Sequence, residues 1–304
     1  MSAVQALWSD VPPDRIFAAL QGETGRQILN AVIAGQLSAA QGAQAFVTGA
    51  MLAQGAGLAT EATMNVGALA GLAMDGRPLA TLLYVPAITT AQALQAGLPA
   101  DVALTRGMAQ MGMLAATTIA DTARTATQVA MTAEPKCVSY VRVVKLPACS
   151  RCIILAGRQY TYSEGFKRHP KCDCGMEPMS DAEWRSRETA QSPEDLFKAM
   201  TPEERRKRFG AAGADALENG ADMGQVVNAR RGMSTTTTGK TVTTEGTTRR
   251  GIGGKALESG FEKTPGSRYE RAKEARLMPE QILKNAHGNR ELQIALLKKH
   301  GYIT

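Results

Sequence analysis

Five cysteines and a histidine gather in one short stretch, and their spacing constrains the fold more than any other feature. The chain has 304 residues, and its metal-type ligands between positions 137 and 174 are Cys137, Cys149, Cys152, His169, Cys172 and Cys174. Two short-spaced ligand pairs separated by a loop are how a chain surrounds a tetrahedral Zn²⁺ ion. The pattern therefore predicts a small zinc-knuckle domain in the middle of the chain.

A tetrahedral site has four positions, and five residues compete for them. Cys149 and Cys152 supply one pair, while His169, Cys172 and Cys174 share the remaining two positions. Such a closed site would be structural, because the free energy of metal binding becomes free energy of folding. The alternative is that packing alone retains these cysteines. Cys137 lies in a predicted strand, and we expect it in the core.

Charge divides the chain into two unlike halves. Residues 1–135 contain no lysine, five arginines and eight acidic residues, so their net charge is −3. Because the whole chain has a net charge of +7, residues 136–304 carry +10. The first half is Ala-rich, and the second is basic enough to lie near phosphate or another acidic surface. No apolar run reaches the roughly twenty residues of a membrane span. The N-terminus has no signal-peptide pattern, so we expect a soluble protein without membrane contact, made in a reducing cytosol.

Helical periodicity dominates the first half. Breaks are predicted near Gly22, Gly35, Gly55 with Gly57, and 75–78, and the longest periodic segment runs from Pro99 to about Ala133. The apolar face of this segment has few large side chains. Two interpretations remain open: an ordinary helical core, or a helical region that a partner chain completes.

The period changes after Pro135. Residues 138–144 and 158–162 have strand composition, whereas Ser192 and Thr201 begin helices with a hydroxyl cap, proline and an acid. Residues 234–254 are rich in Thr, Gly and Arg, which is typical of an extended arm. Amphipathic helices are expected at 279–286 and 289–300. The turn at 251–254 lacks the lysine of a phosphate-binding loop.

These patterns predict a mostly α fold. It consists of an Ala-rich N-terminal helical region, a small central α+β zinc-knuckle domain, and C-terminal helices with an extended Thr/Gly/Arg arm. The predicted domains are a helical, partner-binding region at 1–135, a Cys/His domain with the helices that follow it at 136–232, a flexible basic arm at 233–275, and a helical pair at 276–304.

Three basic clusters are candidate contacts with DNA or a protein partner. Their members are Arg205, Arg206, Lys207, Arg208, Arg230, Arg231, Arg249 and Arg250. Many such runs are simply solvated faces. Because no aromatic residue interleaves with the arginines of the arm, base stacking is not predicted there. We expect weak, sequence-independent DNA binding that falls steeply with salt.

Several stretches carry a family resemblance. Residues 149–158 (CSRCIILAGR) and 165–174 (GFKRHPKCDC) resemble the MuF-like minor capsid proteins of tailed phages that infect actinobacteria. Residues 219–232, 243–251, 276–282 and 299–303 are similar to the same family. The resemblance runs from about residue 82 to the end, and residues 1–80 are only generically similar.

The resemblance implies a virion protein that acts in head assembly. Such a protein would be attached to the portal inside the capsid, with non-specific contact to packaged DNA, after assembly in the host cytoplasm. The major capsid and scaffold proteins are further candidate partners. The alternative is a head-maturation enzyme, a capsid protease or nuclease. A nuclease or a histidine-dependent serine protease needs a correctly positioned histidine, yet His287 and His300 both lie in the C-terminal helical pair, where a solvated face or a helix-dipole contact is expected. A Ser–Lys dyad remains open, although no residue pattern indicates one.

Overall fold

The structure is a computed structural model that describes residues 2–170, 172, 174–186, 191–263 and 265–304. Lys171 and Asp173, which belong to the motif around Cys172, lie outside the described residues. The chain forms two compact units. The first comprises Met1–Lys145 and Gly157–Ala190, and the second Leu146–Ala156 and Gln191–Thr304. Each is described by itself.

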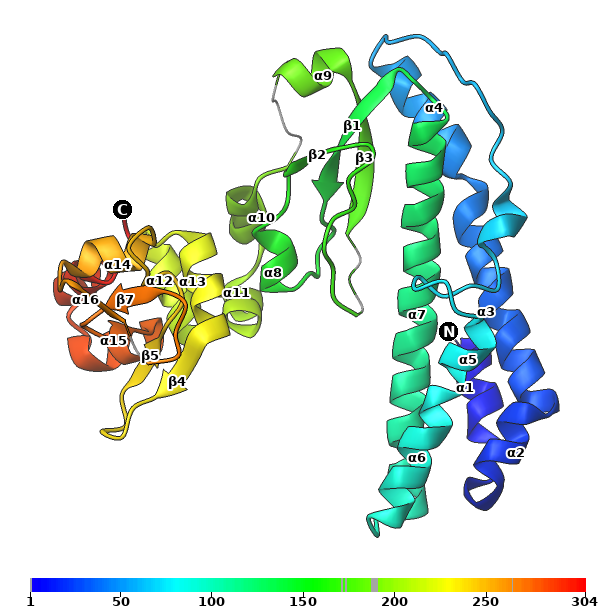
Figure 1. The fold of residues 1–304 in the computed structure, drawn as a ribbon, viewed down its shortest axis with the longest axis horizontal. Helices are drawn as coiled ribbons and strands as arrows, with labels where there is room; N and C mark the ends of the chain where they lie inside the picture. Colours follow the sequence, from blue (N-terminus) through cyan, green and yellow to red (C-terminus); the bar gives the residue numbers. More distant parts are fainter. Residues whose placement is uncertain (1, 171, 173, 187–190, 264) are drawn as a thin grey trace. The chain divides into compact units, whose positions relative to one another are not determined.

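Helices form most of the first unit (Figure 1). In chain order they are α1 (Ser2–Ser9), α2 (Ile16–Gln21), α3 (Glu23–Gln41), α4 (Ala43–Ala53), α5 (Leu79–Leu83), α6 (Val85–Gln95) and α7 (Ala100–Thr132). The long helix predicted after Pro99 is confirmed as α7. Trp8, Ile28 and Met111 are among the buried residues of the core that joins α1, α3 and α7. No helix among the described residues has the length and apolarity that crossing a membrane requires.

One predicted helix break is wrong, for a packing reason. Gly35 lies inside α3, and a Cβ atom there would come within 2.6 Å of the Ile119 side chain on α7. This glycine therefore permits a close helix contact instead of ending a helix. The break falls at Gly42, while those at Gly22 and Gly55 are confirmed.

A three-stranded antiparallel sheet completes the first unit. Its strands are β1 (Cys137–Val143), β2 (Gln159–Thr161) and β3 (Gly175–Ser180), in the order β2-β1-β3, and α9 (Asp181–Ser186) follows. Tyr140 of β1 faces Tyr160 of β2, and their rings stack with centroids 5.2 Å apart. One buried cluster joins β1 and β3 to α3, α4 and α7. It crosses the predicted boundary at 135, and the division into four domains stays a prediction.

The second unit combines short helices and strands. The helices are α8 (Ser150–Ile153), α10 (Pro193–Ala199), α11 (Pro202–Phe209), α12 (Ala211–Glu218), α13 (Met223–Ala229), α14 (Ile252–Leu257), α15 (Pro279–Ala286) and α16 (Arg290–Lys299). Strands β4 (Met233–Thr235), β5 (Thr241–Thr243) and β8 (Arg276–Leu277) form one sheet, and β6 (Phe261–Lys263) pairs with β7 (Glu270–Ala272). The predicted caps at Ser192 and Thr201 are confirmed. So is the mostly α fold class with small antiparallel sheets.

Residues 233–275 differ from the flexible arm that the sequence suggested. They contain four strands and a helix, and Val242 and Thr243 are buried. Hydrogen bonds hold this segment together where large apolar side chains are few. For example, the Thr243 hydroxyl donates to the Ala229 carbonyl at 2.6 Å. Gly253, placed in a flexible turn by the sequence, is buried in α14. A Cβ atom there would lie 2.5 Å from Arg276 Nε.

A buried arginine organises the end of the second unit. Arg276 is 1% exposed, and its guanidinium donates to the carbonyls of His300 (2.7 Å), Glu245 (3.0 Å) and Gly301 (3.0 Å). It also donates to the side-chain oxygen of Gln225 and lies 4.2 Å from the centre of the Tyr302 ring. The last residues of the chain are thereby fixed to β8 and to the loop after β5.

Candidate metal centre

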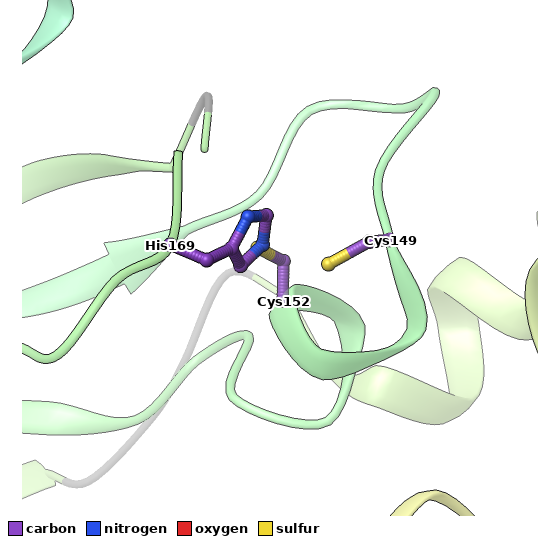
Figure 2. Close-up of side chains that lie close together, drawn as sticks. All are labelled: Cys149, Cys152 and His169. Carbon is purple, nitrogen blue, oxygen red and sulfur yellow. The ribbon is translucent and has the colours of Figure 1, made fainter. Parts of the chain in front are cut away.

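The structure brings all five predicted ligands into two overlapping groups of three. Cys149, Cys152 and His169 form one group, and Cys152, Cys172 and Cys174 form the other. Within each group the sulfur or ring nitrogen atoms all lie within 4.8 Å of one another. Figure 2 shows the Cys149 sulfur, Cys152 and the His169 ring close together. Cys152 is common to both groups and is the central member of the cluster.

Two separate loops supply the ligands. Cys149 precedes α8, and its carbonyl accepts hydrogen bonds from the backbone amides of Cys152 and Ile153 at 3.0 and 3.1 Å. This tight turn places both sulfurs of the pair on one side of the loop between β1 and β2. The other three ligands come from the segment between β2 and β3. The fold thus joins two sequence-distant pairs, as the spacing predicted.

The tautomer of His169 suits metal binding. Its Nδ1 atom lies 2.7 Å from the Pro170 carbonyl oxygen. A carbonyl can only accept, so Nδ1 must carry the proton, and Nε2 keeps its lone pair. Histidine ligands in metal sites are commonly oriented by a hydrogen bond of this kind from the other ring nitrogen.

A buried arginine of β1 donates to two of the sulfurs. Arg142 is 2% exposed, and its Nη2 lies 3.3 Å from Cys174 Sγ and 3.8 Å from Cys172 Sγ. The guanidinium also lies 4.2 Å from the centre of the Phe166 ring. A cation beside a sulfur stabilises the thiolate, which is the form that binds metal. Arg142 was not among the site residues predicted from the sequence, although a charged residue inside a β-branched strand was a usable signal.

Helix α7 holds the backbone of the ligand loop. Arg124 is buried, and it donates from Nε to the Cys174 carbonyl at 2.7 Å and from Nη2 to the Cys172 carbonyl. Asp121 accepts from Arg124 at 2.6 Å and also pairs with Arg168. These residues form a rigid polar support behind the sulfurs. An acid and an arginine three residues apart in a helix with few charges was the sequence signal for them.

Cys137 stands apart from the cluster. It is buried in β1 among the residues that join the sheet to the helices, and its thiol donates to the Ser139 carbonyl at 3.4 Å. Burial raises the pKa of this thiol to about 11. Cys137 is therefore a core residue, as expected, and a matched control for the other cysteines.

The donor set fits a soft or borderline metal ion. Four thiols and an imidazole are ligands typical of tetrahedral sites, and Cys152, Cys172 and Cys174 are buried. Five donors exceed the four that one tetrahedral ion takes, so one of them is surplus. The cluster could therefore hold a metal ion.

Several basic residues predicted to contact DNA have structural partners within the protein. Arg205 lies 4.7 Å from the Phe197 ring centre and donates to the carbonyls of Phe197 and Lys198. Arg230 donates to the Phe209 carbonyl at 2.7 Å and pairs with Glu280. The hydrogen-bonding geometry gives Arg205 and Arg230 roles in packing helices.

The other basic residues are more accessible. Arg206 pairs with Asp215 at 3.4 Å, and Arg249 pairs with Glu270. Lys207, Arg231 and Arg250 are exposed, and Arg208 is half-buried. Contact of this set with DNA or a partner protein stays a prediction.

The two remaining histidines differ from each other. His287 ends α15 in a left-handed conformation (φ 47°) and is exposed. His300 is buried, contrary to the expected solvated face, and its Nδ1 accepts the backbone amide of Leu277 at 3.3 Å. Burial lowers the pKa of His300 to about 4. It is therefore neutral at pH 7 and cannot act as a charged partner of the helix dipole.

Comparison with known proteins gives one match. A family model described as VG15 protein, from a family of viral and phage proteins, matches residues 88–202. The matched part begins in α6, includes α7 and the sheet, and contains every residue of the Cys/His cluster. No curated protein has a detectably similar sequence. No solved structure is detectably similar either. Residues 88–202 are thus similar to a phage protein family.

Proposed function

We propose that this chain is a minor capsid protein of a tailed phage and that it acts in head assembly, bound to the portal inside the capsid. The observation that carries the proposal is the match of residues 88–202 to a phage protein family. The matched segment contains both the Cys/His cluster and the α7 residues that support it. The MuF-like motifs that contain the cluster and follow it in the sequence support the same assignment.

In this proposal the cluster binds structural zinc. The donors are sufficient to close a tetrahedral shell, and a closed shell leaves no position for a substrate or a water. Arg142 and Arg124 hold the sulfurs and their backbone in place from two different elements. When bound, the ion would stabilise thiolates beside Arg142 and connect the two ligand loops.

Partner binding is supported by apolar side chains on the helices of the first unit. Phe46 and Leu52 of α4 are 48% and 55% exposed, and Val129 of α7 is 40% exposed. Exposed apolar residues on neighbouring helices favour completion by another protein. The portal is the partner that the MuF-like resemblance implies, with scaffold and major capsid proteins as further candidates and packaged DNA as a secondary contact.

The alternative of a head-maturation enzyme lacks such an observation. His169 belongs to the metal cluster, and His300 is packed in the core with its Nδ1 engaged by a backbone amide. A protease or nuclease activity is retained here only as an outcome of the test.

Co-purification tests the proposal. The full chain is expressed with the portal protein of the same phage, and the complex is isolated through a tag on the portal. We expect stoichiometric zinc by elemental analysis and retention of the chain. Cys149→Ser should lower the zinc content, whereas the matched variant Cys137→Ser should retain it. Failure to associate with portal, or site-specific cleavage of the major capsid protein by the purified chain, would overturn the assignment.

A further inference from the structure

A basic pocket lies on the second unit and shares no residue with the Cys/His cluster. It has a volume of about 530 Å³ and is lined by Thr248, Arg249, Arg250, Arg268, Tyr269 and Glu270. Three arginines against one glutamate give the lining a net positive charge. Glu270 is engaged by Arg249 in an ion pair, so the remaining excess of charge rests on Arg250 and Arg268. The charge of the pocket is complementary to phosphate.

The pocket also has one aromatic residue in its lining, Tyr269. Tyr269 is 54% exposed, and the guanidinium of Arg268 lies 5.6 Å from its ring centre. Arg249 lies 5.2 Å from the ring centre of Phe261. Arg249 and Arg250 have no aromatic neighbour in the sequence, but folding places Phe261 against Arg249 and brings Tyr269 into the same pocket as both arginines. Arginines together with an accessible ring are the combination that binds a phosphate and a stacked base.

Backbone pairing holds the two sides of the pocket together. The Ala272 amide donates to the Thr247 carbonyl at 2.8 Å, and Thr248 forms a bridge with Arg271. Arg271 donates to the Thr244 carbonyl at 2.6 Å. At the rim, the Ser267 hydroxyl donates to the Tyr269 carbonyl at 2.8 Å. The pocket is therefore formed in the protein without a ligand, which lowers the entropic cost of binding.

From this geometry we infer that the pocket binds single-stranded nucleic acid, with Arg250 and Arg268 on phosphates and Tyr269 stacked on a base. A paired base in a duplex is covered on both faces by its neighbours, so an aromatic ring in a concave site selects an unpaired base. The inference goes beyond the secondary, non-specific DNA contact of the proposed function, on which it rests for its biological setting only.

The test uses the full chain with bound zinc. A fluorescently labelled single strand of mixed sequence, about ten nucleotides long, matches the size that such sites contact. Fluorescence anisotropy is measured with this strand as DNA and as RNA, and with the corresponding DNA duplex, over a series of salt concentrations. We expect either single strand to bind more tightly than the duplex.

Variants separate stacking from charge. Tyr269→Ala should weaken single-strand binding about tenfold and leave the salt dependence unchanged, because one base stack is lost. Tyr269→Phe keeps the ring and should retain affinity. Arg250→Gln should reduce the slope of log affinity against log salt by about 0.7, the contribution of one phosphate contact on a single strand. Lys284→Gln, which removes an exposed charge on α15 that belongs neither to the pocket nor to the predicted DNA contacts, is the matched control. Circular dichroism and the melting temperature verify folding of each variant.

Two results would overturn the inference: duplex binding as tight as single-strand binding, or unchanged single-strand affinity in a folded Tyr269→Ala variant. Portal co-purification of Tyr269→Ala keeps the two proposals distinguishable. Retained portal association with unaltered DNA binding would refute the pocket alone. Loss of portal association by the wild-type chain, with Tyr269-dependent binding intact, would refute only the capsid role.

Discussion

Two fully buried arginines, one beside the Cys/His cluster and one near the C-terminus, have their buried charges compensated by different kinds of acceptor. Arg142 and Arg276 are 2% and 1% exposed, and each guanidinium lies 4.2 Å from the centre of an aromatic ring. Arg276 donates to four oxygens, three of them backbone carbonyls. Arg142 has cysteine sulfurs among its acceptors.

The two sites differ in whether the acceptors of the buried guanidinium depend on a bound metal. Carbonyl and amide oxygens are good acceptors under all conditions, so Arg276 is satisfied by the fold itself. A neutral thiol is a weak acceptor, whereas a metal-bound thiolate is a strong, negatively charged one. Arg142 also donates to the Lys167 carbonyl at 3.3 Å, but its sulfur acceptors gain their charge from the metal. The Arg142 site is therefore expected to be more stable with metal than without it, and the Arg276 site equally stable in both states.

Metal removal should have the largest effect and should act on one region only. We expect treatment with a strong chelator to accelerate amide exchange in residues 149–174, since the binding free energy of structural zinc, about 10 kcal/mol or more in small domains, also stabilises the folded loops. Exchange around Arg276 should not change. The measurement is hydrogen exchange by mass spectrometry, with added zinc as the control for reversal. Equal protection of 149–174 with and without chelator would contradict a structural metal.

Replacing Arg276 should have the next largest effect. Arg276→Met keeps the side-chain length but leaves the carbonyls of His300, Gly301 and Glu245 without this donor, so we expect a loss of about 4 kcal/mol in the free energy of unfolding. Urea denaturation measures it. The loss should be the same in zinc and in chelator. A chelator-dependent loss would show that the two regions are not independent.

The comparison also shows which features could be predicted from sequence. The ligand cluster, α7, the helix caps and the C-terminal helical pair follow from local spacing, and the structure has them. Local patterns carry such features because they depend on residues close in the chain. The choice of four ligands from five was not predictable from sequence, because all five residues have suitable donor atoms at suitable spacing.

The buried polar residues were missed for the opposite reason. Arg276 is satisfied by carbonyls at 245, 300 and 301, and Arg124 by carbonyls at 172 and 174, and no local pattern predicts which distant carbonyls a guanidinium will reach. The strands and the buried residues within 233–275 were missed for a similar reason. The threonines and glycines of this segment appeared too small for a core, but they pack around Arg276 and Ala229 through hydrogen bonds and close backbone contacts.

Acid should act on the Arg276 region through His300. The pKa of His300 is lowered to about 4 from an ordinary value of 6.5, so the unfolded chain binds this proton first as the pH falls. The contribution of neutral His300 to the free energy of unfolding is fully present above pH 6.5. It should decrease by about 3 kcal/mol as the pH falls from 6.5 to 4. The measurement is urea denaturation over this pH range in chelator, so that zinc release does not contribute. His300→Asn, which keeps an acceptor for the Leu277 amide, should reduce the slope in this range. An unchanged slope would refute the assignment.

Replacing Arg142 should have the smallest effect, but it tests the comparison most directly. The change in the free energy of unfolding should have one sign with zinc bound and the opposite sign, or be zero, without zinc. Arg142→Met removes the donor to Cys172 and Cys174, and loss of such a support around a metal site lowers affinity by about tenfold to hundredfold. Competition with a chromophoric chelator measures this. In excess chelator the thiols lose the metal, and a buried charge beside weak acceptors is unfavourable. Methionine should then cost nothing or stabilise the protein.

Arg142→Lys is the matched variant, since it keeps the charge but cannot span both sulfurs with a planar fork. We expect it to fall between wild type and Arg142→Met in zinc affinity. Should Arg142→Met bind zinc as tightly as wild type, the sulfurs do not need the guanidinium. The two arginines would then differ only in their acceptors and not in their dependence on metal.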